Sequence, residues 1–79
     1  MNNIDKYNNT FNTIFNIKVE EMNGDINPDS IHKWDSITHL RLVNTIEDEF
    51  DVMFESEDIL DFRSYDKGKE ILRKYDVEI

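Results

Sequence analysis

The sequence predicts an all-α protein: a small four-helix bundle of three longer helices and one short helix, with a long loop between the first two. The chain has 79 residues, which suffices for one small domain over residues 1–79. Two glycines and one proline are too few for the many turns of a β fold. Apolar side chains also recur three and four residues apart along much of the chain, which is the spacing of one helix face.

The N-terminal part of the chain is predicted to form an amphipathic helix and then a loop. The helix spans residues 3–16, and four apolar side chains share one face of it: Ile4, Tyr7, Phe11 and Ile14. Residues 17–33 follow as a loop, because pairs such as Asn27-Pro28 form turns. Four apolar side chains are expected to anchor this loop: Val19, Met22, Ile26 and Ile31. A loop this long in so small a domain is often functional.

The second helix is the most clearly marked. It begins at Asp35 or Ser36, because either short side chain can accept a hydrogen bond from the free N–H groups of the first turn. It ends near Asp51, and its predicted apolar stripe has five members: Ile37, Leu40, Val43, Ile46 and Phe50. A short helix starts at Ser56, and Ser64 is expected to cap the final helix. Three side chains of that final helix are expected to face inward: Ile71, Leu72 and Tyr75.

The charge of the chain restricts its partners. Nine Lys and Arg residues stand against 18 Asp and Glu residues, which gives a net charge of −9 at pH 7. Such a chain repels nucleic acid and anionic lipid surfaces, so we expect its partners to be proteins with basic patches. The acids are concentrated between Glu47 and Asp61, where no Lys or Arg occurs. This run is either a solvated face that maintains solubility or a surface on which partners dock.

The residues present also exclude several kinds of site and location. No cysteine occurs, so the chain can form neither a disulfide nor a thiolate metal site. The N-terminus lacks the features of a signal peptide, and no apolar stretch is long enough to cross a membrane. We therefore expect a soluble, cytoplasmic monomer.

Two patterns that resemble metal sites are incomplete. Oxygen-bearing residues of the loop imitate the first positions of a calcium-binding EF-hand: Asp25, Asn27 and Asp29. Ser30, however, stands where that motif requires glycine. His32 and His39 have no cysteine or carboxylate at metal-ligand spacing. We predict no metal site, and we expect His39 to lie on the surface.

Four consecutive residues at the start of the second helix form the candidate functional site: Trp34-Asp35-Ser36-Ile37. Taken alone, Asp-Ser-Ile before an apolar helix is an ordinary helix cap. Its surroundings are more informative, because the tripeptide follows a long loop, opens an amphipathic helix and precedes an acidic stretch over residues 47–51. A short acidic helix and a final helix then follow, all in an acidic chain without cysteine.

This combination resembles the acyl carrier protein family. Asp35-Ser36-Ile37 is similar to the Asp-Ser-Leu motif of that family, and residues 46–52 resemble the acidic end of its second helix. Trp34 stands before Asp-Ser in many stand-alone carriers of the family. The resemblance is strong from Trp34 to Tyr75 and looser over the first helix and loop.

The resemblance implies a covalent cofactor on Ser36. A separate phosphopantetheinyl transferase would move 4′-phosphopantetheine from coenzyme A to the Ser36 hydroxyl. The thiol at the end of this arm would carry acyl groups as thioesters, and the chain itself would not be an enzyme. Asp35 would assist the transferase, and Ile37 would begin the apolar stripe beside the arm. A phosphodiester at a helix N-terminus lies near free N–H groups, which stabilise the anion.

The resemblance also implies a docking surface on the second and third helices. Its partners would be an acyl- or aminoacyl-loading ligase and downstream synthases or transferases with basic patches. Four acids are the candidates for this surface: Glu47, Asp48, Glu57 and Asp58. Glu49 is a weaker candidate. The first turns after Ser36 contain Thr38, His39 and Arg41, whereas carriers of general fatty acid synthesis usually have acids there. This departure indicates a dedicated set of partners. These partners would also contact Arg41.

The sequence leaves the cargo and the role of the interior open. The cargo is an acyl intermediate of a fatty acid, polyketide or related specialised pathway, or else an aminoacyl or peptidyl group, including D-alanine for cell-wall polymers. A different class of protein is the further alternative, namely an unmodified acidic helical interaction module in which Asp35-Ser36 is only a cap. Seven apolar residues either form the core or admit a fatty chain between the second and third helices: Leu40, Val43, Ile46, Phe54, Ile59, Leu60 and Phe62.

Overall fold

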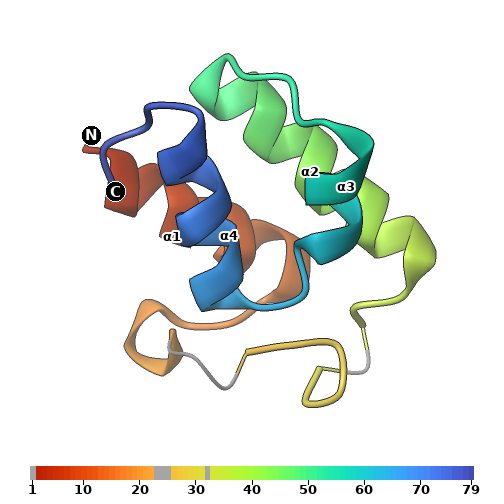
Figure 1. Cartoon of the computed structure of the whole chain (residues 1–79). Coiled ribbons are helices and arrows are strands. Elements are labelled where there is room, and N and C mark those ends of the chain that lie inside the picture. Colours follow the sequence, from red (N-terminus) through yellow and green to blue (C-terminus); the bar gives the residue numbers. More distant parts are fainter. Residues whose placement is uncertain (1, 23–25, 32) are drawn as a thin grey trace.

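The computed structural model describes residues 2–22, 26–31 and 33–79 and confirms the predicted all-α bundle (Figure 1). Its elements are α1 (Asn3–Phe15), the 3₁₀ turn η1 (Val19–Glu21), α2 (Ser36–Phe50), α3 (Ser56–Asp61) and α4 (Tyr65–Lys74). Only η1, inside the long loop, was not predicted. The interpretations of Asp25 and His32 concern residues outside the described ranges. Within those ranges no helix is long and apolar enough to cross a membrane.

Polar residues mark the ends of the three longer helices. At the starts of α1, α2 and α4, the side chains of Asn2, Asp35 and Ser64 each accept a hydrogen bond from the backbone N–H three residues later. Of the two cap candidates for α2, the structure therefore selects Asp35. Helices α1 and α2 end at left-handed residues, Asn16 with φ of 57° and Asp51 with φ of 52°. Asparagine and aspartate tolerate this conformation better than most residues.

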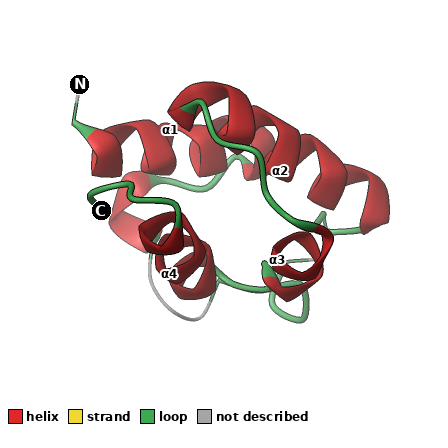
Figure 2. Ribbon diagram, turned by 45° about the horizontal axis from the view of Figure 1, so that its top comes forward, coloured by secondary structure: helices red, strands yellow, loops and turns green. Residues whose placement is uncertain are grey.

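The helices surround one apolar core. Helix α1 packs against α2, α4 lies across from both, and the short α3 lies beside α2 (Figures 1 and 2). The long loop between α1 and α2 is fastened to α4, because the Tyr65 backbone N–H donates to the Ile26 carbonyl oxygen at 2.9 Å. Ile26 itself is buried. The start of α2 is thus held between a loop anchored on α4 and the neighbouring α3.

Aromatic rings make up much of the buried core. Phe11 lies at the centre, with ring centroids 4.9 Å from Tyr7, 5.3 Å from Tyr65 and 5.9 Å from Trp34. Tilted and edge-to-face pairs at these distances are favourable arrangements of aromatic rings. The buried apolar side chains come from every helix except α3: Tyr7, Phe11, Phe15, Ile26, Trp34, Leu42, Val43, Ile46, Phe54, Phe62, Tyr65, Ile71 and Leu72.

The buried face of α2 differs from the predicted stripe. Val43 and Ile46 are buried as expected, but Ile37 and Leu40 are 75% and 54% exposed. Leu42, which lies outside the predicted stripe, is fully buried instead. The reason is that apolar residues cover more than one side of α2, so spacing alone allows two stripes. Packing against α1 selects the side that holds Leu42 and leaves Ile37 and Leu40 facing outward.

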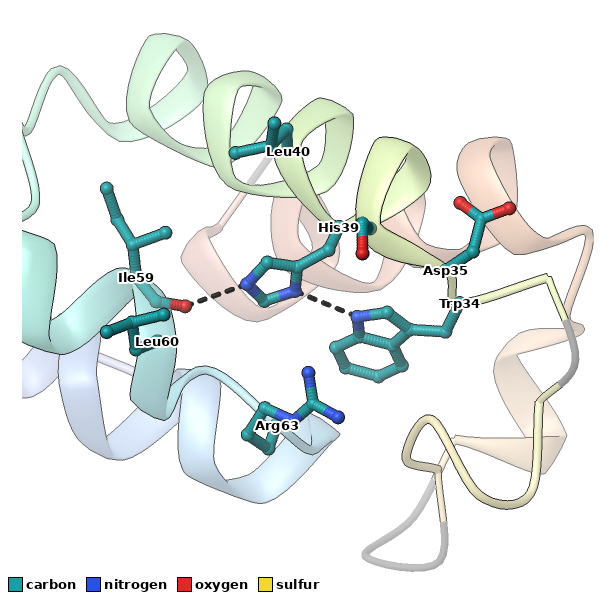
Figure 3. A pocket seen from close by; sticks show the side chains of 8 residues that line it. Trp34, Asp35, His39, Leu40, Ile59, Leu60 and Arg63 are labelled. Carbon is teal, nitrogen blue, oxygen red and sulfur yellow. Dashed lines mark hydrogen bonds between the residues drawn. The ribbon is translucent and has the colours of Figure 1, made fainter.

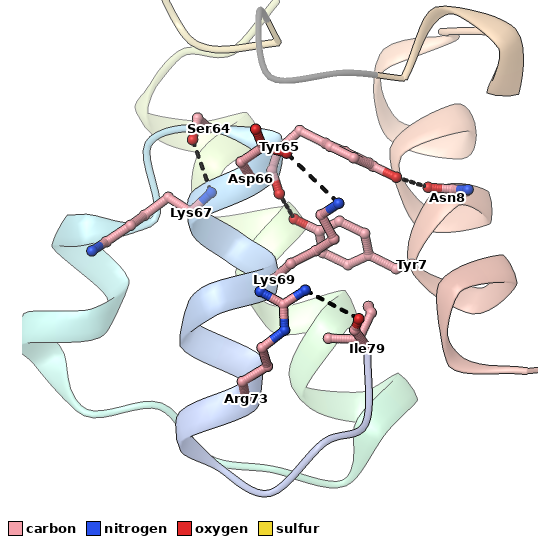
Figure 4. Close-up of polar contacts among 9 residues, drawn as sticks. All are labelled: Tyr7, Asn8, Ser64, Tyr65, Asp66, Lys67, Lys69, Arg73 and Ile79. Atoms are coloured by element: carbon pink, nitrogen blue, oxygen red, sulfur yellow. Dashed lines mark hydrogen bonds and ion pairs between the residues drawn. The ribbon is translucent and has the colours of Figure 1, made fainter.

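A polar contact inside the core joins α1 to α4. The Tyr7 hydroxyl donates to the Tyr65 carbonyl oxygen at 2.5 Å, and the Tyr65 hydroxyl donates to the Asn8 side-chain oxygen (Figure 4). Burial raises the pKa of the Tyr7 hydroxyl well above its usual value, so this group stays a neutral donor. The two helices approach closely because Gly68, in α4, presents no side chain toward Tyr7.

Candidate functional site

Ser36 is the first residue of α2, and its hydroxyl makes no hydrogen bond to any residue that the structure describes. The cap is supplied by its neighbour, because Asp35 Oδ1 accepts from the Thr38 backbone N–H at 2.8 Å. This hydrogen bond holds the pKa of the Asp35 carboxyl below its usual value, so the side chain is a stable anion. Ser36 is exposed, and its hydroxyl has no hydrogen-bond partner in the part of the chain that the structure describes. The Ser36 side chain is therefore open to solvent at the start of α2.

Two buried side chains, Trp34 and His39, connect the start of α2 to α3. The Trp34 indole N–H donates to His39 Nδ1 at 2.9 Å, and His39 Nε2 lies 2.7 Å from the Ile59 carbonyl oxygen of α3 (Figure 3). An indole nitrogen can only donate, so Nδ1 must be the acceptor and Nε2 must carry the proton. The imidazole is thus neutral in this arrangement, and it connects the residue before Asp35 to α3.

His39 is consequently not the surface residue that the sequence analysis expected. It is buried, with 9% of its area exposed, because its position on α2 turns it toward α3. A polar side chain is tolerated there since both ring nitrogens have partners. Trp34 is buried as well, so it acts as a packing anchor at the junction of loop and helix.

A groove of about 470 Å³ begins at Ser36 and runs between α2 and α3 (Figure 3). Its walls contain eight residues: Trp34, Asp35, Ser36, His39, Leu40, Ile59, Leu60 and Arg63. Leu60, for which the sequence left open a place in the core or beside a fatty chain, is 74% exposed and lines this groove. The groove has a polar end at Asp35 and Ser36 and an apolar wall at Leu40, Ile59 and Leu60. Its volume is in the range of small-molecule sites.

The predicted docking residues have different environments. Arg41, Asp48, Glu49 and Glu57 are exposed, so their charges face solvent. Glu47 is partly buried, and its Oε2 accepts from the Phe54 backbone N–H at 2.9 Å. One carboxylate of the predicted surface is therefore already used to hold the turn after α2. Ile37, beside Ser36, is exposed like most of this group.

Asp58 has the most constrained environment of these acids. It is only 5% exposed, and its carboxylate oxygens accept from Lys74 Nζ and from the Tyr75 hydroxyl, each at 2.5 Å. The hydrogen bond from Lys74, with that from Tyr75, holds the pKa of Asp58 below its usual value. Asp58 thus fastens α3 to the end of α4 and offers little of its charge to a partner.

Acid should remove this fastening. Because the folded pKa of Asp58 is lowered, its contribution to stability is complete above the unfolded pKa of about 3.9 and is lost as the pH falls through the folded pKa. At neutral pH we expect Asp58→Asn to be less stable than the unmodified chain by about 1–2 kcal/mol. The effect is no larger because the Lys74 side chain is exposed, so solvent weakens its attraction to Asp58. Urea unfolding at neutral pH and below pH 4 measures the difference.

The matched control for Asp58 is Asp61→Asn, which makes the same charge change at the exposed last residue of α3. This variant should be close to the unmodified chain in stability at both pH values. An Asp58→Asn variant that keeps full stability at neutral pH would show that the carboxylate does not fasten α3 to α4.

Sequence reasoning missed two parts of the site. The partnership of Trp34 and His39 had a weak local signal, since the two residues are five positions apart at a helix start. Arg63, in the turn after α3, had no local signal, because only the fold brings it to the groove.

Within residues 2–22, 26–31 and 33–79, no group of three or more His, Cys, Asp or Glu side chains is arranged to hold a metal ion.

Comparisons with known proteins add evidence on the fold. No model of a protein family matches the sequence, and no curated protein matches it. The structure is similar to a solved structure from Mycobacterium tuberculosis that is described as a "putative acyl carrier protein". The two have a TM-score of 0.76 and 17% sequence identity, over 90% of this chain and 95% of the other. Identity this low supports a statement about fold alone: the chain has the fold of an acyl carrier protein.

Proposed function

We propose that this chain is an acyl carrier protein that is modified on Ser36 with 4′-phosphopantetheine. One observation carries the proposal: Ser36 has an exposed hydroxyl without a partner among the described residues, at the first position of α2, while Asp35 makes the helix cap. A serine needed only as a cap would use its own oxygen for that purpose. The sequence motif around Ser36 and the fold both support this role.

The residues around Ser36 fit a phosphopantetheine group. The hydroxyl opens onto solvent and onto the groove between α2 and α3, so an attached chain has room to leave the surface or to lie along it. The first N–H groups of α2 favour an anion at this place. When bound, the group supplies a flexible arm with a terminal thiol, which forms thioesters. The chain has no cysteine of its own to provide such a thiol.

The site supports a carrier rather than a catalyst. Ser36 lacks a base in the described structure, since both nitrogens of His39 are engaged with Trp34 and the Ile59 carbonyl. Attachment would therefore need a separate phosphopantetheinyl transferase. The free acids Asp48 and Glu57, with Arg41, would meet that enzyme and the loading ligase and synthases. Exposed charges of this kind give fast and exchangeable association.

The groove favours an acyl cargo over an aminoacyl one. Its wall away from Ser36 is formed by Leu40, Ile59 and Leu60, which would shelter a hydrocarbon chain but offer nothing to an ammonium group. We accordingly assign the chain to a fatty acid, polyketide or related specialised pathway, in the cytoplasm. The transferase would contact Asp35 and Ile37, which are exposed on each side of Ser36.

Intact-protein mass spectrometry tests this proposal. The chain is incubated with coenzyme A, magnesium and a promiscuous transferase, with Ser36→Ala in parallel. We expect the unmodified chain to gain the mass of one phosphopantetheine group and Ser36→Ala to gain nothing. If two different transferases add no mass, the chain is better described as an unmodified acidic interaction module.

Stability measurements on neighbouring variants separate capping from modification. Ser36→Ala should melt at the same temperature as the unmodified chain, because the Ser36 hydroxyl makes no hydrogen bond to a described residue. Asp35→Ala should melt several degrees lower, since it loses the cap. Asp35→Asn keeps a good cap while removing the charge. It should keep its melting temperature and be loaded more slowly. A lower melting temperature for Ser36→Ala would assign the cap to Ser36 and weaken the proposal.

A further inference from the structure

Arg63 is a cation at the groove, and it has no partner among the residues that the structure describes. It follows α3 and is exposed, and its guanidinium points into the groove beside the rings of Trp34 and His39 (Figure 3). No hydrogen bond or ion pair joins it to any residue within the described ranges. In α4, by contrast, Lys74 and Arg73 are both bonded, to Asp58 and to the Ile79 carbonyl oxygen.

The groove has few other polar groups that could bind a ligand. The Trp34 indole N–H and both His39 nitrogens already have partners. Asp35 is an anion and would repel another anion. The guanidinium of Arg63 is therefore the one free charged donor among the residues that line the groove, opposite the apolar Leu40 and Leu60. A ligand that suits the groove has an anionic group with apolar carbon atoms close to it.

The charge of the chain indicates how such an anion reaches Arg63. A net charge of −9 repels anions from solution, and Asp35 adds a negative charge at the mouth of the groove. An anion attached to Ser36 overcomes this repulsion, because a tether gives it a high effective concentration at the groove. Its charge beside Asp35 would then need a nearby cation. Arg63 is placed to supply one.

We propose that Arg63 is a positioning residue for the prosthetic arm: it pairs with the phosphodiester on Ser36 and directs the dimethyl-substituted carbons that follow the phosphate toward Leu40 and Leu60. This inference rests on the proposed modification of Ser36. Arginine suits the role because its planar guanidinium can donate two parallel hydrogen bonds to phosphate oxygens. The paired arm would lie between α2 and α3, beside the groove residues Leu40 and Leu60.

Nuclear magnetic resonance of the loaded chain tests this pairing. The chain is first loaded with phosphopantetheine, and mass spectrometry confirms the loading. We expect the Arg63 side-chain Nε–H signal to shift and to exchange more slowly with water after loading. The ³¹P signal of the phosphodiester should differ between the unmodified sequence and Arg63→Gln. Arg63→Lys should give an intermediate ³¹P shift, because it keeps the charge and loses the paired donors.

Lys18→Gln is the matched control, since it removes one exposed positive charge that does not line the groove. Its ³¹P signal should equal that of the unmodified sequence. If loading succeeds and the Arg63 signal is unchanged, with the same ³¹P shift in Arg63→Gln, the pairing is wrong and the carrier function stands. If no variant is loaded, the proposed function and this inference fail together.

Discussion

Gly68→Ala is expected to destabilise the bundle by about 2–3 kcal/mol, a large part of the stability of a small domain. A Cβ at this position would overlap the Tyr7 hydroxyl and the Phe62 ring, whose Cε1 would lie only 2.7 Å away. Tyr7 and Phe62 are both fully buried, so neither ring can move aside without disturbing the core. Alanine would gain about 1 kcal/mol of helix propensity over glycine, which is smaller than the cost of the overlap.

Urea unfolding of four variants measures this effect: Gly68→Ala, Tyr7→Phe, the two combined, and a control. Glu70→Ala, at an exposed position of α4, is the control and should change stability little. Tyr7→Phe with Gly68→Ala removes the hydroxyl that the Cβ meets, so Gly68→Ala should cost less in that background than alone. The Phe62 overlap would remain. A Gly68→Ala chain that is as stable as the unmodified one would show that α1 and α4 are not as close as described.

His39→Ala should cost about 2–4 kcal/mol. The substitution leaves the Trp34 indole N–H and the Ile59 carbonyl oxygen without their partner, and it empties the space of the imidazole ring. A buried donor or acceptor that loses its hydrogen-bond partner still bears the free-energy cost of being removed from water, and no hydrogen bond offsets that cost. Because His39 lies under the start of α2 and against α3, its loss should also loosen the groove beside Ser36 (Figure 3).

His39→Leu separates packing from hydrogen bonding. Leucine fills much of the space but restores neither hydrogen bond, so we expect it to remain destabilised, though less than His39→Ala. Trp34 is the single tryptophan of the chain, and its fluorescence reports directly on the environment of the indole. Both variants should change the emission of the folded state. Full stability of His39→Leu, with unchanged emission, would show that the two hydrogen bonds contribute nothing.

Local patterns predicted the helices well for physical reasons. Asp35 and Ser64 were identified as possible caps because capping depends on the side chain and the N–H groups of the next turn. The face of α2 was predicted less well, because its apolar residues allow more than one stripe. The choice of Leu42 over Leu40 is made by packing against another helix. That information is absent from the sequence of α2 alone.

The residues of the candidate site also differ in how well the sequence predicted their environment. Ser36 was singled out by a contiguous motif, and the structure shows its hydroxyl exposed and without a partner in the described ranges. His39 was expected on the surface because it is polar, and its burial depends on Trp34 and on a carbonyl of α3, 20 residues away. Asp58 was grouped with the docking acids, and its burial depends on residues of the last helix. Arg63 reaches the groove only through the fold.

The central claim is that Ser36 is the attachment point of a phosphopantetheine arm, and peptide mapping of the loaded chain tests it most directly. The chain is treated with coenzyme A and a transferase, digested, and fragmented in the mass spectrometer. We predict that the added mass lies on the peptide that contains Ser36, while the peptides with Ser30, Ser56 and Ser64 are unmodified. Absence of added mass, or its location on any of the other serines, would contradict the claim.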